Sequence, residues 1–328
     1  MADLKTNYMG IELKNPIVVG ACSLSKRVET VRALEDAGAG ALVLKSLFEE
    51  QVQLERKEFE NEVSQYDALY AEAINLFPQM EYGGSKEHLF WVKEARKAVK
   101  MPLIASLNAV NEETWLEYSK QLADTGVDGL ELNFYSQPLD PEVSAADIEK
   151  RELDIFLKIR GAVKIPLAVK LHPYYTNVFQ VAKNFSDAGA DGLILFNRLF
   201  QPDINIDKVG EQSNFQLSSS ADAGLSLRWT ALLYNRIKAD LISNTGIMTA
   251  NDAAKAILAG SSSVQVVSTL YKNNVNYIST MLKELDGWMN KKGYSSIEEF
   301  RGLASKDKTD DPWGYERAQY IKALLGFD

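Results

Sequence analysis

The sequence predicts an α/β fold, a (β/α)8 TIM barrel, from three observations. Eight short apolar runs recur along the 328 residues. Four of them follow a glycine-containing turn of the kind that ends a helix, and three of the other four open with proline, which suits the start of a strand. Helical periodicity fits between most of the runs, so eight strand–helix units account for the length.

The two kinds of run alternate along the chain. In order, they are NPIVVGAC (15–22), DAGAGALVLKS (36–46), MPLIASLN (101–108), DTGVDGLELNF (124–134), IPLAVKLHP (165–173), DAGADGLILFN (187–197), ADLISNTG (239–246) and LAGSSSVQVVST (258–269). Near-continuous apolar runs are typical of parallel strands that are covered on both faces. A doubly wound open sheet is the rival architecture, but no GxGxxG motif follows the first run.

The uneven spacing of the runs predicts insertions in some loops. We expect the barrel to span residues 1–302, with its longest insertion at 49–74, directly after the second strand. This charged segment is either a solvated helix or loop, or a lid on the face where barrel active sites lie.

Residues 303–328 are expected to form a C-terminal helical extension. Asp311 and Pro312 suit a helix start, with the aspartate as cap and the proline in the first turn. One face of this helix would be apolar, and we favour its packing on the chain's own barrel over a second subunit. The residues of that face are Trp313, Ala318, Ile321, Leu324 and Leu325.

Composition excludes several functional classes. The chain has 36 basic and 45 acidic residues, a net charge of −9, which argues against nucleic-acid or anionic-membrane partners. The N-terminal stretch has no apolar signal-peptide core, and no window approaches 18 uninterrupted apolar residues. One cysteine excludes an internal disulfide framework or an iron–sulfur cluster held by this chain, and two distant histidines argue against a zinc site. A soluble, cytoplasmic protein without a metal is expected.

Polar or small residues stand at the ends of all eight strands, where the active site of such a barrel gathers. A single asparagine there is usually a turn residue, whereas several asparagines and two lysines converging on one mouth favour a ligand site. Each lysine either snorkels to water or is held for a negative ligand, and we favour the ligand. In chain order the strand ends are Gly20 with Ala21, Lys45 with Ser46, Asn108, Asn133, Lys170, Asn197, Asn244 and Ser268.

These groups suggest the chemistry of the ligand. Asparagine amides both donate and accept, which suits a planar ring with amide-like edges, and lysine suits an anionic ring or a phosphate. The turns at 243–253 and 266–274 are rich in small residues, and the corresponding loops of this fold commonly bind phosphate through backbone N–H groups. Flavin mononucleotide (FMN) fits both features.

With these residues in place, the sequence resembles the dihydroorotate dehydrogenase family, closest to its soluble class 1 type. The resemblance covers nearly the whole barrel. It rests on the motifs KS (45–46), ELNFYSQP (131–138), VKLHPYY (169–175), NTGI (244–247) and KGYSSIEEFRG (292–302), of which the last is the most specific.

The resemblance implies an FMN-dependent oxidoreductase that oxidises dihydroorotate to orotate in pyrimidine biosynthesis, working as a homodimer. In that family a loop residue removes a proton while hydride passes to flavin N5. The base is Cys in class 1 and Ser in class 2, and Ser136 falls on its position. Lys170 matches the lysine beside flavin N1, which stabilises the reduced ring.

The remaining roles follow residue by residue from the same resemblance. Asn75, Asn133 and Asn197 would bind the substrate. The cofactor would be held by Gly20, Ala21, Lys45, Ser46, Asn108, Lys170, Asn244, Gly246, Ile247, Ser268 and Thr269, of which the last two and the Gly246–Ile247 pair would cradle the phosphate.

Two departures from the family pattern leave questions open. Gln137 and Pro138 stand where the family has Pro-Asn, so one substrate-binding amide is missing. Ser136 could therefore cap a turn rather than act as base, since a serine needs a relay or a charged neighbour. Arg198 replaces a family serine and would either pair with a substrate carboxylate or face solvent.

Two further residues lie near strand ends. Cys22 is expected to be a small buried thiol rather than a nucleophile. His172, two residues beyond Lys170, would be either a general acid or a structural hydrogen-bonding group.

Three alternatives to the leading hypothesis remain. The first is an FMN enzyme with a different substrate, and the second is a non-catalytic flavin-binding paralogue. The third, of another class, is a lyase or aldolase that forms a Schiff base on Lys170, which would need a depressed pKa. The electron acceptor is left open, although the absence of an N-terminal membrane helix argues against direct use of quinone.

Overall fold

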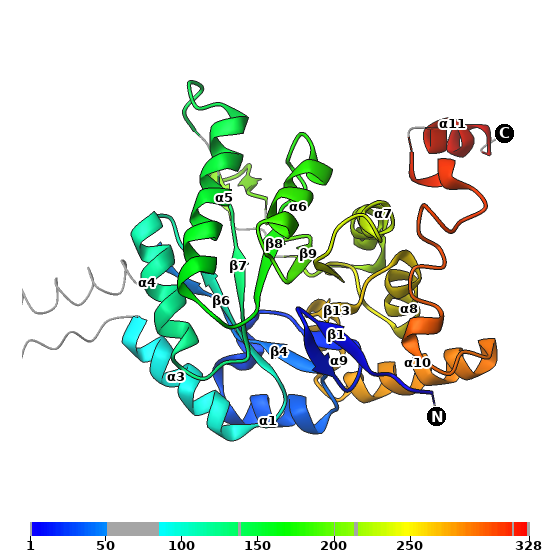
Figure 1. Cartoon of the computed structure of the whole chain (residues 1–328), viewed down its shortest axis with the longest axis horizontal. Coiled ribbons are helices and arrows are strands. Elements are labelled where there is room, and N and C mark those ends of the chain that lie inside the picture. Colours follow the sequence, from blue (N-terminus) through cyan, green and yellow to red (C-terminus); the bar gives the residue numbers. More distant parts are fainter. Residues whose placement is uncertain are drawn as a thin grey trace, which may run out of the picture.

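The computed structural model describes residues 2–50, 85–136, 139–199, 201–212, 216–316 and 318–326. Its centre is a ring of eight parallel strands, with helices around the outside (Figure 1). The pairing β4–β6 closes the ring, so the sheet has the barrel form that the sequence predicts. A (β/α)8 barrel is therefore the observed fold.

Every predicted apolar run contains one barrel strand. The eight are β3 (Ile17–Val19), β4 (Ala41–Val43), β6 (Leu103–Asn108), β7 (Gly129–Asn133), β8 (Leu167–Leu171), β9 (Gly192–Leu195), β12 (Asp240–Ser243) and β13 (Ser263–Val266). Neighbours pair in chain order around the ring, so the carboxyl ends of all eight strands meet at one mouth. The two-residue strand β5 (Leu47–Phe48) pairs with the end of β6.

Helices follow the strands and cover their outer faces. They are α1 (Val28–Asp36), α3 (Ser85–Ala98), α4 (Glu112–Ala123), α5 (Ala145–Ala162), α6 (Val178–Asp187), α7 (Gly224–Leu233), α8 (Ala250–Ala259), α9 (Ser268–Asn273) and α10 (Tyr277–Lys292). The largest hydrophobic cluster lies between strands and helices and draws residues from almost every unit. It is the main source of stability for the barrel wall.

The recurring Asp-Gly turns before β7 and β9 have a structural explanation. Arg160, at the end of α5, forms an ion pair of 3.0 Å with Asp191 and also donates to two carbonyls of the following loop. The same aspartate oxygen accepts the N–H of Leu167. Arg96 and Asp128 repeat this arrangement earlier in the barrel. Each pair fastens a helix end to the sheet.

An N-terminal hairpin that the sequence reading did not foresee closes the amino end of the barrel. Its strands are β1 (Thr6–Tyr8) and β2 (Ile11–Leu13), and in Figure 1 it lies beside the barrel strands. Tyr8, Met9 and Leu13 are buried with the inward-facing side chains of six barrel strands, which form a second, separate core. The barrel interior is thus filled by side chains and is not a pore.

A second hairpin, β10 (Asp203–Asn205) and β11 (Gly210–Gln212), lies between β9 and α7. The insertion expected at 49–74 lies outside the described residues apart from its first two positions. Of these, Glu49 accepts hydrogen bonds from the backbone N–H groups of Val110 and Asn111.

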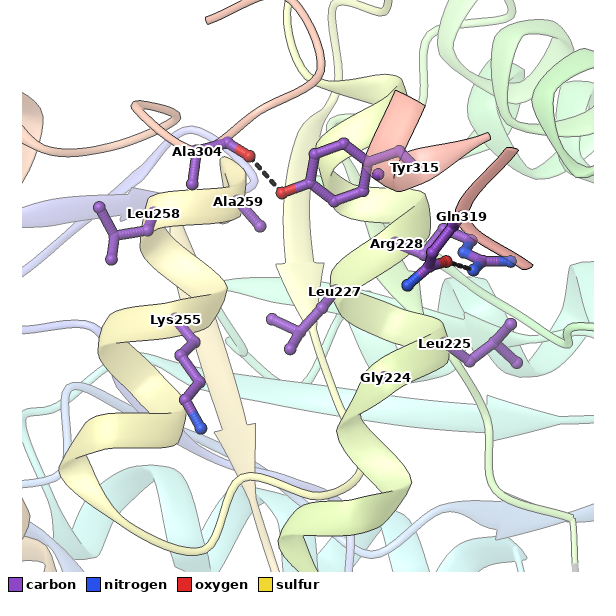
Figure 2. A pocket seen from close by; sticks show the side chains of 11 residues that line it. Gly224, Leu225, Leu227, Arg228, Lys255, Leu258, Ala259, Ala304, Tyr315 and Gln319 are labelled. Carbon is purple, nitrogen blue, oxygen red and sulfur yellow. Dashed lines mark hydrogen bonds between the residues drawn. The ribbon is translucent and has the colours of Figure 1, made fainter. Parts of the chain in front are cut away.

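The C-terminal segment runs along α8 and ends in the short helix α11 (Ala318–Leu325) at the edge of the molecule (Figure 1). Tyr315 donates to the carbonyl of Ala304, and Gln319 contacts Arg228 of α7 (Figure 2). These contacts border a cavity of about 570 Å³ between the segment, α7 and α8.

Contrary to the prediction, the apolar face of this extension is not packed on the barrel. Trp313 is 62% exposed, and Ile321 and Leu325 are 58% and 69% exposed. The segment is attached to the barrel instead through polar contacts, including the Arg236–Asp307 ion pair. Among the described residues, no helix is both long enough and apolar enough to cross a membrane.

Candidate active site

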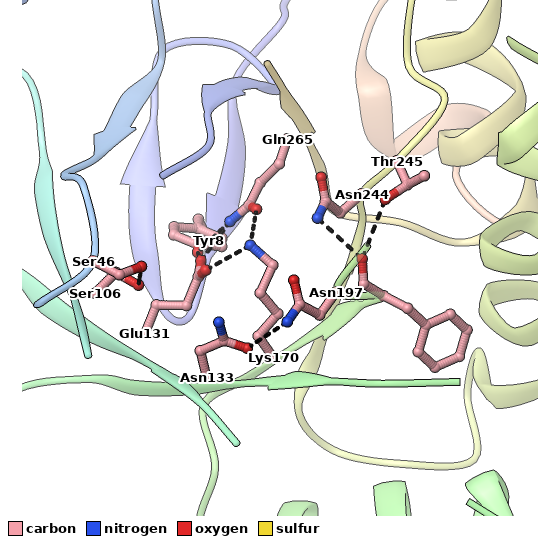
Figure 3. A network of polar contacts seen from close by, with 11 residues as sticks. Tyr8, Ser46, Ser106, Glu131, Asn133, Lys170, Asn197, Asn244, Thr245 and Gln265 are labelled. Carbon is pink, nitrogen blue, oxygen red and sulfur yellow. Dashed lines mark hydrogen bonds and ion pairs between the residues drawn. The ribbon is translucent and has the colours of Figure 1, made fainter. Parts of the chain in front are cut away.

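A buried polar network lies inside the barrel, close to the mouth (Figure 3). Lys170, on β8, donates to Glu131 of β7 at 3.0 Å and to Gln265 of β13 at 3.3 Å. Gln265 in turn donates to Glu131 at 2.5 Å and to the hydroxyl of Tyr8 at 3.1 Å. Tyr8 completes the network by donating to Glu131 at 3.0 Å. Three strands and the hairpin therefore meet at one carboxylate.

The energetics of this network depend on complete pairing. Glu131 is 0% exposed, and an isolated carboxylate at such a site would cost many kcal/mol. Its two oxygens accept from one ammonium, one amide and one hydroxyl, which offset that cost. The pKa of Tyr8 is raised well above its ordinary value by burial and by the nearby carboxylate, so the phenol remains a donor. Lys170 is thereby held rigidly at the strand end.

Two of the predicted substrate asparagines are brought together at the mouth. Asn197, just beyond β9, donates to the side-chain oxygen of Asn133 at the end of β7, at 3.0 Å. Asn133 pairs in register with Lys170 across neighbouring strands, and Figure 3 shows the two amides beside the lysine. Each amide of the pair keeps hydrogen-bonding capacity beyond this one bond. The third predicted substrate residue, Asn75, lies outside the described residues.

Asn244 and Thr245 hold the neighbouring strand end. The amide of Asn244 donates to the carbonyl of Phe196 at 3.1 Å, and the hydroxyl of Thr245 reaches the same carbonyl at 3.3 Å (Figure 3).

On the opposite side of the mouth, Ser46 and Ser106 share a hydrogen bond of 2.7 Å, and Asn108 is buried at the end of β6. The backbone N–H of Lys45 donates to Ser25 at 2.8 Å.

The predicted phosphate loops lie side by side. Helix α9 begins at Ser268, and its first backbone bonds run from Leu270 and Tyr271 to Val267, so the N–H groups of Ser268 and Thr269 precede the intrahelical ladder. The hydroxyl of Thr269 is fixed by Met248 of the adjacent loop at 2.8 Å. These amides are chemically suited to a phosphate.

Gly246, in the other loop, has a φ of +80° and packs against Ala223. A Cβ there would lie 2.4 Å from the backbone nitrogen of Ala223, so both conformation and space require glycine. Gly20, at the end of β3, is similarly close to Val267, whose Cγ2 would lie 2.9 Å from an added Cβ. The wall of the mouth is therefore shaped by glycine at two of the predicted cofactor positions.

Ser136 has a charged neighbour that the sequence did not indicate. Its Oγ donates to Glu152 Oε1 at 2.9 Å, and Tyr175 donates to the other oxygen at 2.8 Å. Glu152 lies on α5, is 3% exposed, and has a pKa raised by burial. The serine itself lies on the exposed loop after β7.

His172 lies behind this group rather than free at the mouth. Its ring stacks on Tyr175, with centroids 3.8 Å apart, and its Nδ1 accepts the backbone N–H of Tyr174 at 3.1 Å. Burial lowers its pKa to about 4, so the imidazole is neutral near pH 7 and accepts rather than donates at Nδ1. The structural hydrogen-bonding role is the one the geometry favours.

Arg198 and Cys22 are two further residues whose roles the sequence left open. Arg198 is half-buried, donates to the carbonyl of Gln216 and lies near Asp222. Cys22 is half-buried against the main core, and burial raises its pKa, which argues against a thiolate nucleophile. Gln137 and Pro138 lie outside the described residues.

Sequence reasoning missed Glu131, Gln265, Tyr8, Glu152 and Tyr175. Two of them had a usable signal: Glu131 interrupts an apolar strand two residues before Asn133 and thus shares its face, and Gln265 interrupts the last strand in the same way. Nothing local marks Glu152, which lies on a helix rich in charged residues.

The chain is similar to known proteins over nearly its whole length. The family model described as dihydroorotate dehydrogenase matches residues 3–289. A relative from Thermoplasma volcanium, named dihydroorotate dehydrogenase B (NAD(+)), catalytic subunit, is 29% identical over 316 residues, which cover 93% of this chain and 100% of the relative. A protein of the same name from Methanocaldococcus jannaschii is 27% identical, covering 92% of this chain and 98% of the relative.

Proposed function

The chain belongs to the dihydroorotate dehydrogenase family, and we propose on that premise that it is an FMN-dependent oxidoreductase that converts dihydroorotate to orotate. One observation carries the proposal: Lys170, Asn133 and Asn197 meet at the carboxyl ends of three neighbouring strands. A fixed positive charge beside paired amides suits a planar anionic ring and its substrate.

The residues at the mouth fit FMN in the chemistry of their donors. Gly20 and Ala21 would lie against the ring, and its polar edges would be bound by Lys45, Ser46, Asn108, Lys170 and Asn244. The phosphate would be held by Gly246, Ile247, Ser268 and Thr269, a role supported by the amides at the start of α9. When bound, FMN supplies the acceptor for the hydride that leaves the substrate.

The chain's own residues would orient the substrate and move a proton. Asn133 and Asn197, with Asn75 from outside the described residues, would bind dihydroorotate by its amide edges. Ser136 would take the proton from the substrate carbon. Lys170 would hold its positive charge at the end of β8, because Glu131 and Gln265 fix its ammonium group.

The same contacts weigh against a lyase or aldolase that uses Lys170. A Schiff base requires a neutral amine with a free lone pair. The ammonium of Lys170 instead donates to a fully buried carboxylate at 3.0 Å. This arrangement favours a fixed charge over a nucleophile.

The names of the relatives bear on the electron acceptor and on partner subunits. Both are named as the catalytic subunit of dihydroorotate dehydrogenase B (NAD(+)). With one cysteine in the chain, we propose that electrons leave the flavin to a soluble acceptor or to a partner subunit that carries its own cofactor. We also propose a cytoplasmic homodimer, as the family resemblance implies.

An anaerobic titration of FMN-saturated protein with dihydroorotate tests the proposal, with the visible flavin band as readout. We expect bleaching in proportion to substrate, slowed by about 10²–10⁴-fold in Ser136→Ala. Ser295→Ala is the matched control, because Ser295 also donates to a glutamate, Glu299, but on the exposed surface. It should bleach as wild type does.

Two other outcomes would contradict parts of the proposal. If the protein binds no FMN, the proposal of an FMN-dependent oxidoreductase is wrong. Flavin-loaded wild type that dihydroorotate does not bleach would leave either another substrate or a non-catalytic flavin protein.

A further inference from the structure

We propose that Glu152 is a positioning residue for the reaction, which holds the hydroxyl of Ser136 and receives its proton. The inference rests on the proposed function and assigns a role to a residue that lies outside the asparagine and lysine positions at the strand ends. It begins from the hydrogen bond of 2.9 Å between Ser136 Oγ and Glu152 Oε1.

The direction of this bond is suited to proton transfer. An ionised carboxylate only accepts hydrogen bonds, so the hydroxyl of Ser136 must be the donor in its hydrogen bond with Glu152. The lone pairs of Ser136 Oγ are then left for the proton of a substrate bound at the mouth. A serine hydroxyl accepts a proton near neutral pH only with such a base behind it.

The surroundings of Glu152 hold the carboxylate in one place. It is 3% exposed, whereas Ser136 lies on the exposed loop, so the carboxylate is behind the serine and not in solvent. Tyr175 donates to its second oxygen at 2.8 Å and is itself stacked on His172. The surface contact between Ser295 and Glu299 lacks this burial, because Glu299 is exposed.

The charged and titratable groups around Glu152 act in both directions. Burial raises its pKa, the hydrogen bonds from Tyr175 and Ser136 lower it, and nearby Glu149 raises it while Arg151 lowers it. The net direction is upward, which brings the carboxyl nearer to the working range of a general base at neutral pH.

The step balances as follows. A C–H bond of dihydroorotate breaks, its proton forms an O–H bond with Ser136, and the original Ser136 proton passes to Glu152. The electron pair left on that carbon forms the new C=C bond of orotate as hydride leaves the adjacent carbon to the flavin of the proposed function. Glu152 later releases the proton to water, and the site is restored.

The competing explanation is that Glu152 only ties the loop to α5. Two isosteric variants separate the two roles. Glu152→Gln keeps an acceptor for Ser136 but cannot take its proton. Tyr175→Phe keeps the stacked ring beside His172 and removes one hydrogen bond that favours the ionised carboxylate, so it should raise the pKa of Glu152 further.

The experiment measures single-turnover bleaching of FMN-saturated protein by dihydroorotate across pH, with FMN content and thermal unfolding of each variant recorded alongside. In wild type the rate should rise with pH through an inflection. Glu152→Gln should lose that inflection and slow by about 10²–10⁴-fold, with FMN content unchanged. In Tyr175→Phe the inflection should move to higher pH.

Glu149→Gln is the matched control, since it makes the same chemical change one turn earlier on α5. It should keep the rate within a few-fold and move the inflection slightly lower, because a negative neighbour is removed. An infrared titration of the cofactor-free protein gives a readout apart from activity. In wild type the protonated-carboxyl band that titrates above the ordinary range should contain contributions from Glu152 and Asp240, whose pKa values are both raised by burial. Glu152→Gln should lose the Glu152 contribution and keep that of Asp240.

Failure of this inference differs from failure of the proposed function. If wild type bleaches and Glu152→Gln keeps both rate and inflection, Glu152 has only a structural role. The inference is then overturned, while the proposed function stands. If flavin-loaded wild type does not bleach, the proposed function fails and the inference fails with it. Should Glu152→Gln not fold, the shift or its absence in Tyr175→Phe decides.

Discussion

Glu131 is the residue on which the polar interior of the barrel depends. It joins β7, β8, β13 and the N-terminal hairpin through Lys170, Gln265 and Tyr8. In a fully buried setting, removing one charge of an ion pair leaves the other uncompensated, which is more costly than the pair itself is stabilising. Stability and the placement of Lys170 therefore depend on the same carboxylate.

Glu131→Gln is accordingly predicted to lower the free energy of unfolding by roughly 3–5 kcal/mol, because Lys170 loses its counter-charge inside the barrel. Chemical denaturation measures it. Glu12→Gln is the control, since Glu12 forms an exposed pair with Lys5 at 3.5 Å and should change stability by at most about 1 kcal/mol. Equal effects of the two substitutions would contradict the assigned role of Glu131.

At this scale the sequence predicted part of the site. Lys170, Asn133 and Asn197 could be found because they end apolar strands, and strand ends meet in a barrel. Glu152 and Tyr8 could not, since their contacts join residues 16 and 123 positions apart and depend on how a helix and a hairpin pack. Long-range side-chain pairs leave no local pattern to read.

Among the elements, the hairpin β1–β2 is the one whose absence from the sequence prediction matters most. Its strands have three residues each, too short for a clear period-two pattern, and its turn places Met9 and Gly10 at positive φ. The eight barrel strands were predictable because each is an apolar run between turn residues. The hairpin is recognised only from where its side chains are buried.

Gly129, the first residue of β7, leaves the space that Met9 of the hairpin fills. A Cβ on Gly129 would lie 2.1 Å from Met9 Cε. Gly129→Ala is predicted to destabilise the fold by about 1–3 kcal/mol, because the methionine must move in a packed core. The double substitution with Met9→Ala should lose less than the sum of the two single changes, since the added methyl then has room.

The measurement is a double-mutant cycle by chemical denaturation. Gly287→Ala, in the helix α10 with no atom near the added methyl, is the control and should stabilise by about 1 kcal/mol. Additive effects of Gly129→Ala and Met9→Ala would show that the hairpin does not press on β7 at this point.

For the whole molecule, the half-buried His88 and the buried His172 predict how stability depends on pH. The chain contains only His88 and His172, and burial lowers the pKa of each to about 4, with nearby Lys45 contributing at His88. Among the described residues, Nε2 of His88 has no hydrogen-bond partner, and Nδ1 of His172 accepts a backbone N–H. Both rings are therefore built in as neutral groups.

The sign follows from proton counting. Between about pH 6.5 and 4 the unfolded chain binds these protons and the folded chain does not, so their stabilising contribution is full above pH 6.5 and is lost as pH falls through 4. Each site should contribute roughly 1–2 kcal/mol after allowance for partial access to solvent. The raised carboxyls of Glu152 and Asp240 act in the opposite direction, so the comparison must be between variants.

His172→Phe keeps the ring stacked on Tyr175 but cannot be protonated, and His88→Phe does the same at the second site. Each variant should show a shallower fall in unfolding free energy between pH 6.5 and 4, and the double variant the shallowest. The lost acceptor for Tyr174 shifts the His172→Phe curve equally at all pH values and leaves its slope informative. Denaturation curves at several pH values measure the slopes; a double variant as steep as wild type would mean that other groups govern acid stability, because these two histidines would then already be charged in the folded protein.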